Sequence, residues 1–315
     1  MHIVIYGAGG VGGYFGGKLA QSNNNVTFIA RGKHLNAINE KGLTVKSIKG
    51  NFHLPKVNAQ NNLDNIEKVD LIILAVKTFQ LNEIFNDLKK IIKNETVILP
   101  LLNGIKNYEI LSKEFGKDKV IKGLCKIYSK IEEYGVVNHF GITPQIIIGE
   151  HNNNLTSRIK NIQKLFIDSD IKTFISEDID KDLWSKYMFI CTIGGVGCIL
   201  KQNIGNIREN EYSRNLLNKC LVEIYDIAKK NNVNFDESIV DKTMISIDNM
   251  PFNSESSMQR DIMQNKPSEI YELTGEIISL ADKHNLNIPI NKFIFDCLNQ
   301  LTIESKNQKN NVAIV

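Results

Sequence analysis

The sequence is poor in cysteine and proline and lacks any long uninterrupted run of apolar residues. Its five cysteines are an odd number, and none is spaced as Cys-x-x-Cys: Cys125, Cys191, Cys198, Cys220 and Cys297. This pattern argues against a disulfide framework and a zinc site, so we expect reduced thiols, a cytoplasmic location and no bound metal. There is no run of about 18 apolar residues and no basic leader before MHIVIYGAGG, so we expect neither a membrane span nor a signal peptide.

A strong excess of charge of either sign is also missing. Lysine and arginine total 38 against 35 aspartates and glutamates, which gives a formal net charge of +3. Because the basic residues are interspersed with acids, a nucleic-acid partner is not expected. The chain has 315 residues, of which 42% are hydrophobic and 23% charged, a composition typical of a globular protein of about two domains.

The first half of the chain alternates short apolar segments with helical patterns. Strands are predicted over His2–Tyr6, Val26–Arg31, Asp70–Val76, Thr96–Leu102 and Ile171–Ser176, and helices over Val11–Gln21, His34–Lys41 and Thr78–Lys93. Two segments with turn glycines, Leu43–Val57 and Val120–Gly149, indicate a hairpin-like insertion and an antiparallel extension. The alternation predicts an α/β domain of the Rossmann type, with a doubly wound parallel sheet, over residues 1–178.

The second half of the chain shows only helical periodicity. Helices are predicted over Asp180–Gln202, Glu209–Asn231, Ser238–Asn249, Ser268–His284 and Asn291–Ser305. Asp180 and Ser268 are candidate N-caps. We therefore expect an all-helical C-terminal domain over residues 179–305 and a loose tail over residues 306–315.

The turn between the first strand and the first helix matches the pattern GxGxxG. Its residues are Gly7, Ala8, Gly9, Gly10, Val11 and Gly12. In a strand–loop–helix setting the first glycine permits the tight turn, the second lets the backbone approach a pyrophosphate, and the third lets the helix pack on the strand. A glycine turn without a ligand is the alternative, but the complete setting favours dinucleotide binding.

The end of the second strand indicates which dinucleotide is bound. NAD-binding domains usually place an acid about 20 residues beyond the glycine loop, where it binds the ribose 2′-hydroxyl. Here Arg31 is followed by Gly32, Lys33 and His34, with no acid. Cations at this point suit a 2′-phosphate, so NADP(H) is the predicted cofactor. An ordinary solvated basic turn is the alternative.

From about Met1 to Leu301 the sequence resembles the ketopantoate reductase (2-dehydropantoate 2-reductase) family. The opening GAGGVGGYFGGKLA…VTFIARGKHL is similar to the opening of that family. AVKTFQ places Lys77 and Gln80 on the family's Lys-x-x-Gln, and LLNGIKN places Asn103 on its Asn-Gly. In the helical half, DLWSKYMF places Lys186 on the family's catalytic lysine. SSMQRDIMQNKPSEIYELTG places Ser257 on its substrate-binding serine and Glu269 on its glutamate.

The resemblance implies a reductase with its active site between a Rossmann domain and a helical domain. Hydride would pass from NADPH to the C2 carbonyl of a small-molecule 2-oxo acid, giving pantoate from ketopantoate in pantothenate and coenzyme A biosynthesis. Lys186 would be the general acid, and Glu269 a catalytic and cofactor-contacting residue. Lys77 and Gln80 would line the cofactor, Asn103 would contact cofactor and substrate, and Ser257 would bind the substrate. The resemblance also makes a homodimer plausible.

Taken alone, Lys186 and Glu269 also allow purely structural interpretations. Lys186 lies in an apolar stretch, where a lysine is costly unless it is paired, functional or extended to solvent. Glu269 could be an exposed acid in the first turn of its helix.

The sequence departs from the family pattern after the lysine. Asparagines that bind the hydroxyl end of the substrate are replaced by Ile190, Gly194 and Ile204, and Asn203 and Asn253 lie beside aligned positions. A different 2-oxo acid therefore stays open as the substrate. A catalytically silent NADP(H)-binding redox sensor is the alternative from another functional class.

Overall fold

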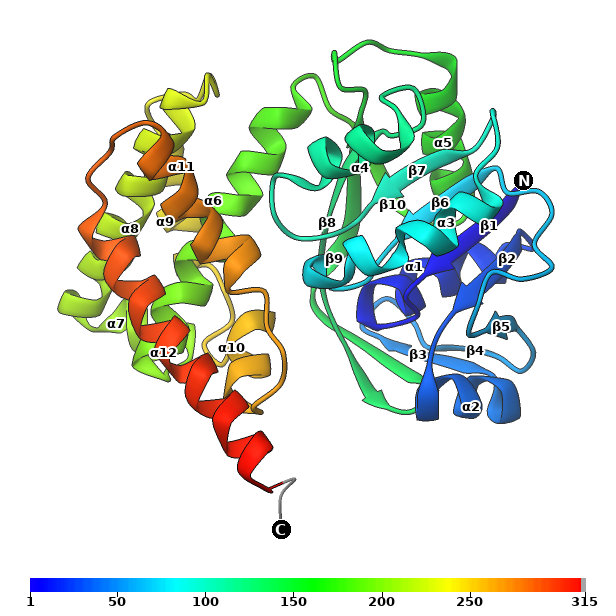
Figure 1. The fold of residues 1–315 in the computed structure, drawn as a ribbon, viewed down its shortest axis with the longest axis horizontal. Helices are drawn as coiled ribbons and strands as arrows, with labels where there is room; N and C mark the ends of the chain where they lie inside the picture. Colours follow the sequence, from blue (N-terminus) through cyan, green and yellow to red (C-terminus); the bar gives the residue numbers. More distant parts are fainter. Residues whose placement is uncertain (313–315) are drawn as a thin grey trace. The chain divides into compact units, whose positions relative to one another are not determined.

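The computed structural model describes residues 1–312, with side chains for residues 1–300. The chain divides into two compact units, Met1–Ile179 and Asp180–Val315 (Figure 1). The sequence places the domain boundary between residues 178 and 179. The units are described separately below.

A parallel five-stranded sheet forms the centre of the first unit, in the order β5-β2-β1-β6-β7. Its strands are β1 (His2–Tyr6), β2 (Asn25–Ile29), β5 (Asn58–Gln60), β6 (Leu71–Leu74) and β7 (Val97–Pro100). From β1 the chain adds β2 on one side and later adds β6 on the other. Such a reversal creates the switch point at which doubly wound sheets bind ligands. The predicted fold class is thus confirmed.

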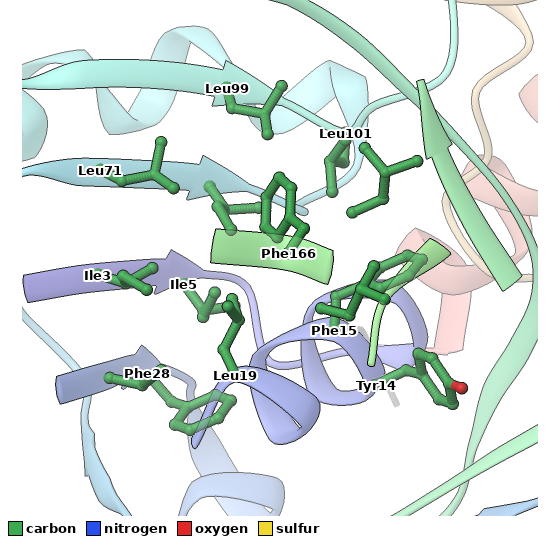
Figure 2. Packing of buried hydrophobic residues seen from close by; sticks show 14 of the residues in the cluster. Ile3, Ile5, Tyr14, Phe15, Leu19, Phe28, Leu71, Leu99, Leu101 and Phe166 are labelled. Carbon is green, nitrogen blue, oxygen red and sulfur yellow. The ribbon is translucent and has the colours of Figure 1, made fainter. Parts of the chain in front are cut away.

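Helices cover both faces of this sheet, which explains why its inner strands are apolar throughout. They are α1 (Gly10–Gln21), α2 (Gly32–Lys41), α3 (Phe85–Ile91), α4 (Asn107–Phe115) and α5 (Ser157–Asp168). Along β1, Ile5 joins a buried cluster with Phe15 and Leu19 of α1 (Figure 2). The next residue, Tyr6, belongs to a second cluster with Leu88 of α3. Burial on alternate faces removes the polar positions that a half-exposed strand would show.

A second sheet combines the predicted antiparallel segments with the predicted strand Ile171–Ser176. It has the order β10-β9-β3-β4, with β8 paired to β9. Its strands are β3 (Leu43–Ser47), β4 (Phe52–Leu54), β8 (Lys122–Glu133), β9 (Val136–Gly149) and β10 (Lys172–Ile175). β9 pairs in parallel with both β3 and β10. β3 and β4 form an antiparallel pair, as do β8 and β9, so both antiparallel predictions are confirmed.

The predicted helix Thr78–Lys93 is wrong in its first half. Two short 3₁₀ turns, η1 (Thr78–Gln80) and η2 (Asn82–Ile84), precede α3. The Thr78 hydroxyl donates to the carbonyl oxygen of Asn103, 2.9 Å away, and the Gln80 amide oxygen accepts from the Lys77 N–H at 3.2 Å. These contacts hold the start of the segment in a tighter turn than an α-helix.

The second unit is helical throughout the residues that the structure describes. Its elements are α6 (Ile179–Leu200), α7 (Ile204–Glu209), α8 (Glu211–Lys230), α9 (Ile239–Asp248), α10 (Ser257–Met263), η3 (Tyr271–Gly275), α11 (Glu276–Lys283) and α12 (Pro289–Val312). Among the described helices, α6 alone is long and apolar enough to cross a membrane by length and composition, although 67% of the apolar window is buried. Such burial is what the core helix of a bundle also shows.

Three predictions for this unit need correction. α6 begins at Ile179, so Asp180 lies in its first turn and is not its N-cap. The predicted helix Ser268–His284 begins only at Tyr271, and its first turn, η3, is a π-helix in which the Gly275 N–H donates to the Ile270 carbonyl. Ser268 is therefore not its N-cap. Residues 306–312 belong to α12 and are not a loose tail, because the helix continues to Val312. Residues 313–315 of the predicted tail lie outside the described residues.

Candidate functional site

In the first unit, the predicted site residues follow the carboxyl ends of four parallel strands. The glycine loop follows β1, Arg31 follows β2, Lys77 and Gln80 follow β6, and Asn103 follows β7. Because parallel strands end at the same edge of a sheet, the fold brings these segments to one edge. This is the edge at which doubly wound sheets bind nucleotides.

The glycine loop leaves no room for side chains at its first and last glycines. Gly7 has φ +105°, and a Cβ there would lie 2.8 Å from the Ala75 carbonyl oxygen. A Cβ on Gly12 would lie 2.0 Å from the Gly7 carbonyl oxygen. At Gly9, by contrast, a Cβ would meet nothing within 4 Å. The loop is thus packed on the protein side and open at its middle glycine, as close approach of a ligand to the backbone requires.

The start of α1 offers hydrogen-bond donors to an anion. The N-cap residue of α1 is Gly9, and no side-chain hydrogen bond caps the helix within the described part of the chain. The first N–H groups of a helix have no intrahelical partner and carry the positive end of its dipole. The hydroxyl of Ser129 in β8 is buried without a hydrogen-bond partner among the described residues, and it lies 2.9 Å from where a Cβ on Gly10 would be. Open donors and an unsatisfied hydroxyl fit a pyrophosphate group at this point.

Arg31 is exposed and extended at the N-cap position of α2, directly after β2. At the end of the adjacent strand, the Tyr6 hydroxyl donates to an Asp87 carboxylate oxygen at 3.0 Å. Burial and Asp87 raise the pKa of Tyr6 to about 12, and the nearby Arg31 guanidinium opposes this rise. His34 is buried, so the basic cluster expected after β2 consists at the surface of Arg31 and Lys33.

The loops after β6 and β7 are joined to each other. Beside the bond from Thr78, the Asn107 side chain donates to the carbonyl oxygen of Asn103 at 2.9 Å. Lys77 and Gln80 are half-buried and form one local turn. The structure thereby brings together the Lys-x-x-Gln and Asn-Gly segments, which lie more than twenty residues apart in the sequence.

In the second unit, Lys186 lies within α6 and is half-buried. It makes no ion pair or hydrogen bond with any residue that the structure describes. Its neighbours Trp184, Tyr187 and Met188 are buried. An amine that is partly withdrawn from water without a partner lacks the usual compensation for its burial.

Glu269 is connected to the same helix through the π-turn. The Tyr187 hydroxyl donates to the Leu273 carbonyl oxygen at 2.6 Å, and the Leu273 N–H donates to the Glu269 carbonyl oxygen at 2.9 Å. Glu269 is 2% exposed, so the alternative of an exposed first-turn acid is wrong.

The π-turn also carries polar atoms that lack partners. Burial, with a contribution from Glu269, raises the pKa of the Glu272 carboxyl group. Oε2 of Glu272 and the Ser268 hydroxyl are buried without a hydrogen-bond partner among the described residues. Wide helical turns and unsatisfied polar atoms both occur preferentially at functional sites.

Ser257 is the half-buried first residue of α10, whose N-cap is Ser256. A Cβ on Gly194 would lie 3.0 Å from the Met258 side chain and 3.4 Å from the Ser256 hydroxyl. The glycine therefore allows α10 to pack on α6, two helical turns beyond Lys186. Ile190, one turn beyond Lys186, is half-buried.

The two asparagines near the missing family positions have structural partners. The Asn203 side chain caps α7 by accepting from the Asn206 N–H at 3.0 Å, and it donates to Asn253 at 3.4 Å. Ile204, which replaces the third asparagine, is buried at the start of α7. These bonds occupy side-chain donors and acceptors that the two asparagines would otherwise offer to a substrate hydroxyl.

Sequence reasoning did not single out Ser129, Tyr6, Asp87 or the π-turn. Ser129 lies in β8, far from the glycine loop in sequence, and nothing local marks it as a neighbour of Gly10. Near this site the sequence offered only His34, three residues after Arg31, as a further signal. Only its burial in the structure shows that it faces the protein.

Comparison with known proteins covers both units. Residues 3–153 match the family model described as ketopantoate reductase PanE/ApbA, and residues 178–302 match the model of its C-terminal part. An uncharacterized oxidoreductase of Bacillus subtilis, YkpB, is 31% identical over 94% of this chain and 97% of its own length. A 2-dehydropantoate 2-reductase of Pyrococcus abyssi is 32% identical over 94% and 96%, respectively. The solved structure of a 2-dehydropantoate 2-reductase from Geobacter metallireducens superposes with a TM-score of 0.90 at 27% identity, covering 95% of this chain and 99% of that one.

Proposed function

Because this chain belongs to the ketopantoate reductase family and is an oxidoreductase of that family, we propose that it reduces the C2 carbonyl of a 2-oxo acid with NADPH. The proposed substrate is 2-dehydropantoate and the product is pantoate. The observation that carries this proposal is Lys186, a half-buried amine without a partner among the described residues, in a helix bonded to the turn after the buried Glu269.

The residues of the first unit suit a dinucleotide. The backbone of Gly7 to Gly12 and the start of α1 would hold the pyrophosphate. Arg31 would bind the 2′-phosphate through its planar guanidinium. Lys77, Gln80 and Asn103 would line the nicotinamide half. The bound dinucleotide supplies the hydride.

The residues of the second unit supply the charge and the proton that carbonyl reduction needs. As hydride adds to C2, negative charge develops on the carbonyl oxygen. The Lys186 ammonium group would stabilise that oxygen and donate the proton that completes the hydroxyl group. Ser257 would bind the substrate carboxylate, and the Glu269 carboxylate would bridge between the cofactor and the Lys186 side of the site. The net change is one hydride and one proton added to the substrate.

The proposal extends to the cellular setting. Reduction of 2-dehydropantoate would place the protein in pantothenate and coenzyme A biosynthesis, in the cytoplasm and as a homodimer. Sedimentation equilibrium of the purified chain tests the homodimer.

A panel of 2-oxo acids tests the activity directly. Purified protein is mixed with NADPH and each acid in turn, and the loss of absorbance of the reduced nicotinamide is followed. We expect turnover with 2-dehydropantoate or a related branched 2-oxo acid. Binding of NADPH without turnover of any acid would contradict the proposal and favour a redox sensor.

The apolar residues beyond Lys186 favour a second candidate substrate. Ile190 is half-buried one turn from the amine, and Gly194 is covered by α10. An apolar pocket rejects a substrate that merely adds a hydroxyl by only about 10², whereas a pocket built to hydrogen-bond that hydroxyl rejects the analogue without it by about 10⁴–10⁵. A plain branched 2-oxo acid is therefore the alternative to 2-dehydropantoate.

Steady-state assays with 2-dehydropantoate and its 4-deoxy analogue measure this difference. We expect the ratio of kcat/KM for the two acids to stay below about 10². The Ile190→Asn variant returns a hydrogen-bonding side chain beside Lys186 and is expected to raise the ratio. A wild-type ratio of about 10⁴ or more would show that other groups bind the hydroxyl, and the usual activity of the family would then stand unmodified.

A further inference from the structure

His34 connects the glycine loop to two other segments of the first unit. It lies in the first turn of α2 and is 8% exposed. Its Nε2 is 2.8 Å from the Ala8 carbonyl oxygen, and its Nδ1 is 3.1 Å from the backbone nitrogen of Gly135. Both contacts are buried, so water does not compete for them.

The two partners determine where the ring proton lies. The backbone N–H of Gly135 can only donate, so Nδ1 must be an unprotonated acceptor. The carbonyl of Ala8 can only accept, so Nε2 must carry the proton. His34 is therefore neutral, with both nitrogens used, and it is not one of the cations available to a phosphate.

The far end of this connection is held firmly. Gly135 forms the turn between β8 and β9 with φ +83°, and its carbonyl oxygen accepts from the Thr44 N–H at 2.9 Å. A Cβ on Gly135 would lie 3.3 Å from the Cβ of Ala37 in α2. The turn is thus packed against both β3 and α2 and gives His34 a fixed point.

The near end of the connection is the peptide group between Ala8 and Gly9. The N–H groups of Gly7 and Ala8 both donate to the Ile29 carbonyl oxygen, at 3.0 and 3.2 Å. Because the peptide is planar and trans, holding the Ala8 carbonyl toward His34 turns the Gly9 N–H the opposite way. That N–H has no partner among the described residues, and Gly9 is the open position of the loop.

We propose that His34 is a positioning residue for dinucleotide binding, which holds the Ala8–Gly9 peptide so that the Gly9 N–H is presented to the pyrophosphate. This inference rests on the proposed function, because it assumes that the loop binds a dinucleotide. His34 contacts the loop from behind and does not touch the ligand.

Protonation of His34 should free the ring from Gly135, its fixed point, although Nε2 can still donate to the Ala8 carbonyl oxygen. A proton on Nδ1 would face the Gly135 N–H, so two donors would oppose each other. Burial lowers the pKa of His34 below 6.5, and the bond to the Ala8 carbonyl partly opposes this shift. Arg31 and Lys33 on α2, and Glu133 and Tyr134 beside the turn, do not contribute to this pKa shift. The glycine loop has no titratable group. The bond from the Gly135 N–H to Nδ1 is therefore intact at neutral pH and is lost as pH falls through the lowered pKa of His34.

The test compares NADP⁺ binding to the wild type and to the His34→Gln variant between about pH 5 and 8 by calorimetry. Glutamine can donate to Ala8 but offers Gly135 a poorer acceptor and does not titrate. One neutral hydrogen bond corresponds to about a two- to tenfold change in Kd, so we expect the variant to bind that much more weakly at pH 8. The ratio of the two Kd values should approach one as pH falls through the lowered pKa of His34, because the wild type then loses the bond that the variant lacks. The ligand's own titration cancels in the ratio.

His139 provides the matched control. It is buried in the same unit, its pKa is also lowered by burial, and it bonds to Ser47 and Ile142 and not to the loop. The His139→Gln variant should keep the pH dependence of the wild type. A His34→Gln ratio that stays constant as pH falls through the pKa of His34 would overturn the inference but leave the proposed function intact. Absence of NADP⁺ binding to the wild type would overturn both.

A measurement on the wild type covers the case in which His34→Gln does not fold. The His34 pKa is followed by NMR of ¹⁵N-histidine-labelled protein with and without NADP⁺. If the neutral ring supports binding, NADP⁺ must lower that pKa, because the linkage is reciprocal. An unchanged His34 pKa in the saturated protein would exclude the positioning role.

Discussion

The Lys186→Ala variant is expected to lose about 10²–10⁴ in kcat, the usual contribution of a general acid, and to keep its affinity for NADPH. The proton and the positive charge at the developing alkoxide both come from this amine in the proposed mechanism. The proposed contacts of the glycine loop and Arg31 with the cofactor lie in the first unit and should persist. Single-turnover and steady-state rates of NADPH oxidation, together with NADPH titration, separate the two effects.

Two further variants sharpen this test. Lys186→Arg keeps the charge but is a poor proton donor, so it should recover less activity at neutral pH than a purely electrostatic role would allow. Lys181→Ala removes another lysine of α6, one that pairs with Asp236, and should leave kcat unchanged. A folded Lys186→Ala protein that retains most of its kcat would remove this lysine from the mechanism.

The Arg31→Ala variant is expected to bind NADPH about 10–150-fold more weakly, which corresponds to a charge-assisted contact of about 1.5–3 kcal/mol. NADH lacks the 2′-phosphate, so its affinity should barely change. Fluorescence titration of both reduced cofactors against the same protein gives the ratio. Because Arg31 is exposed, the contrast should shrink as salt is raised.

Lys33→Ala is the matched control for Arg31. Lys33 is also exposed but lies two residues further along, within the first turn of α2, so its removal should have a smaller effect on NADPH binding. Equal affinity of the wild type for NADH and NADPH would contradict the assignment of the 2′-phosphate to Arg31. The proposed dinucleotide site at the glycine loop would survive that result.

Local patterns predicted four of the five parallel strands of the first unit and the edge at which they end. They did not predict β5, and the predicted strand Ile171–Ser176 joins the second sheet as β10. An apolar strand followed by Gly7-Ala8-Gly9 and a helix is a short-range signal, since each step depends on neighbours in sequence. The parallel sheet then aligns strand ends, so positions as far apart as Arg31 and Asn103 could be assigned to one edge in advance. Helix boundaries were less predictable where a tertiary bond, such as that from Thr78 to Asn103, tightened the chain.

The sequence by itself thus determined the strand–helix alternation of the first unit, the helical character of the second, the glycine loop and the missing acid after β2. Periodicity and turn chemistry are encoded by adjacent residues. Only the tertiary structure decided which polar groups are withdrawn from water. Glu269 is buried because the π-turn is bonded to α6, and His34 faces inward because Ala8 and Gly135 supply its partners. Gly194 acquires its role from the approach of α10. Burial and hydrogen bonding between distant segments depend on packing in three dimensions, which a one-dimensional pattern does not contain.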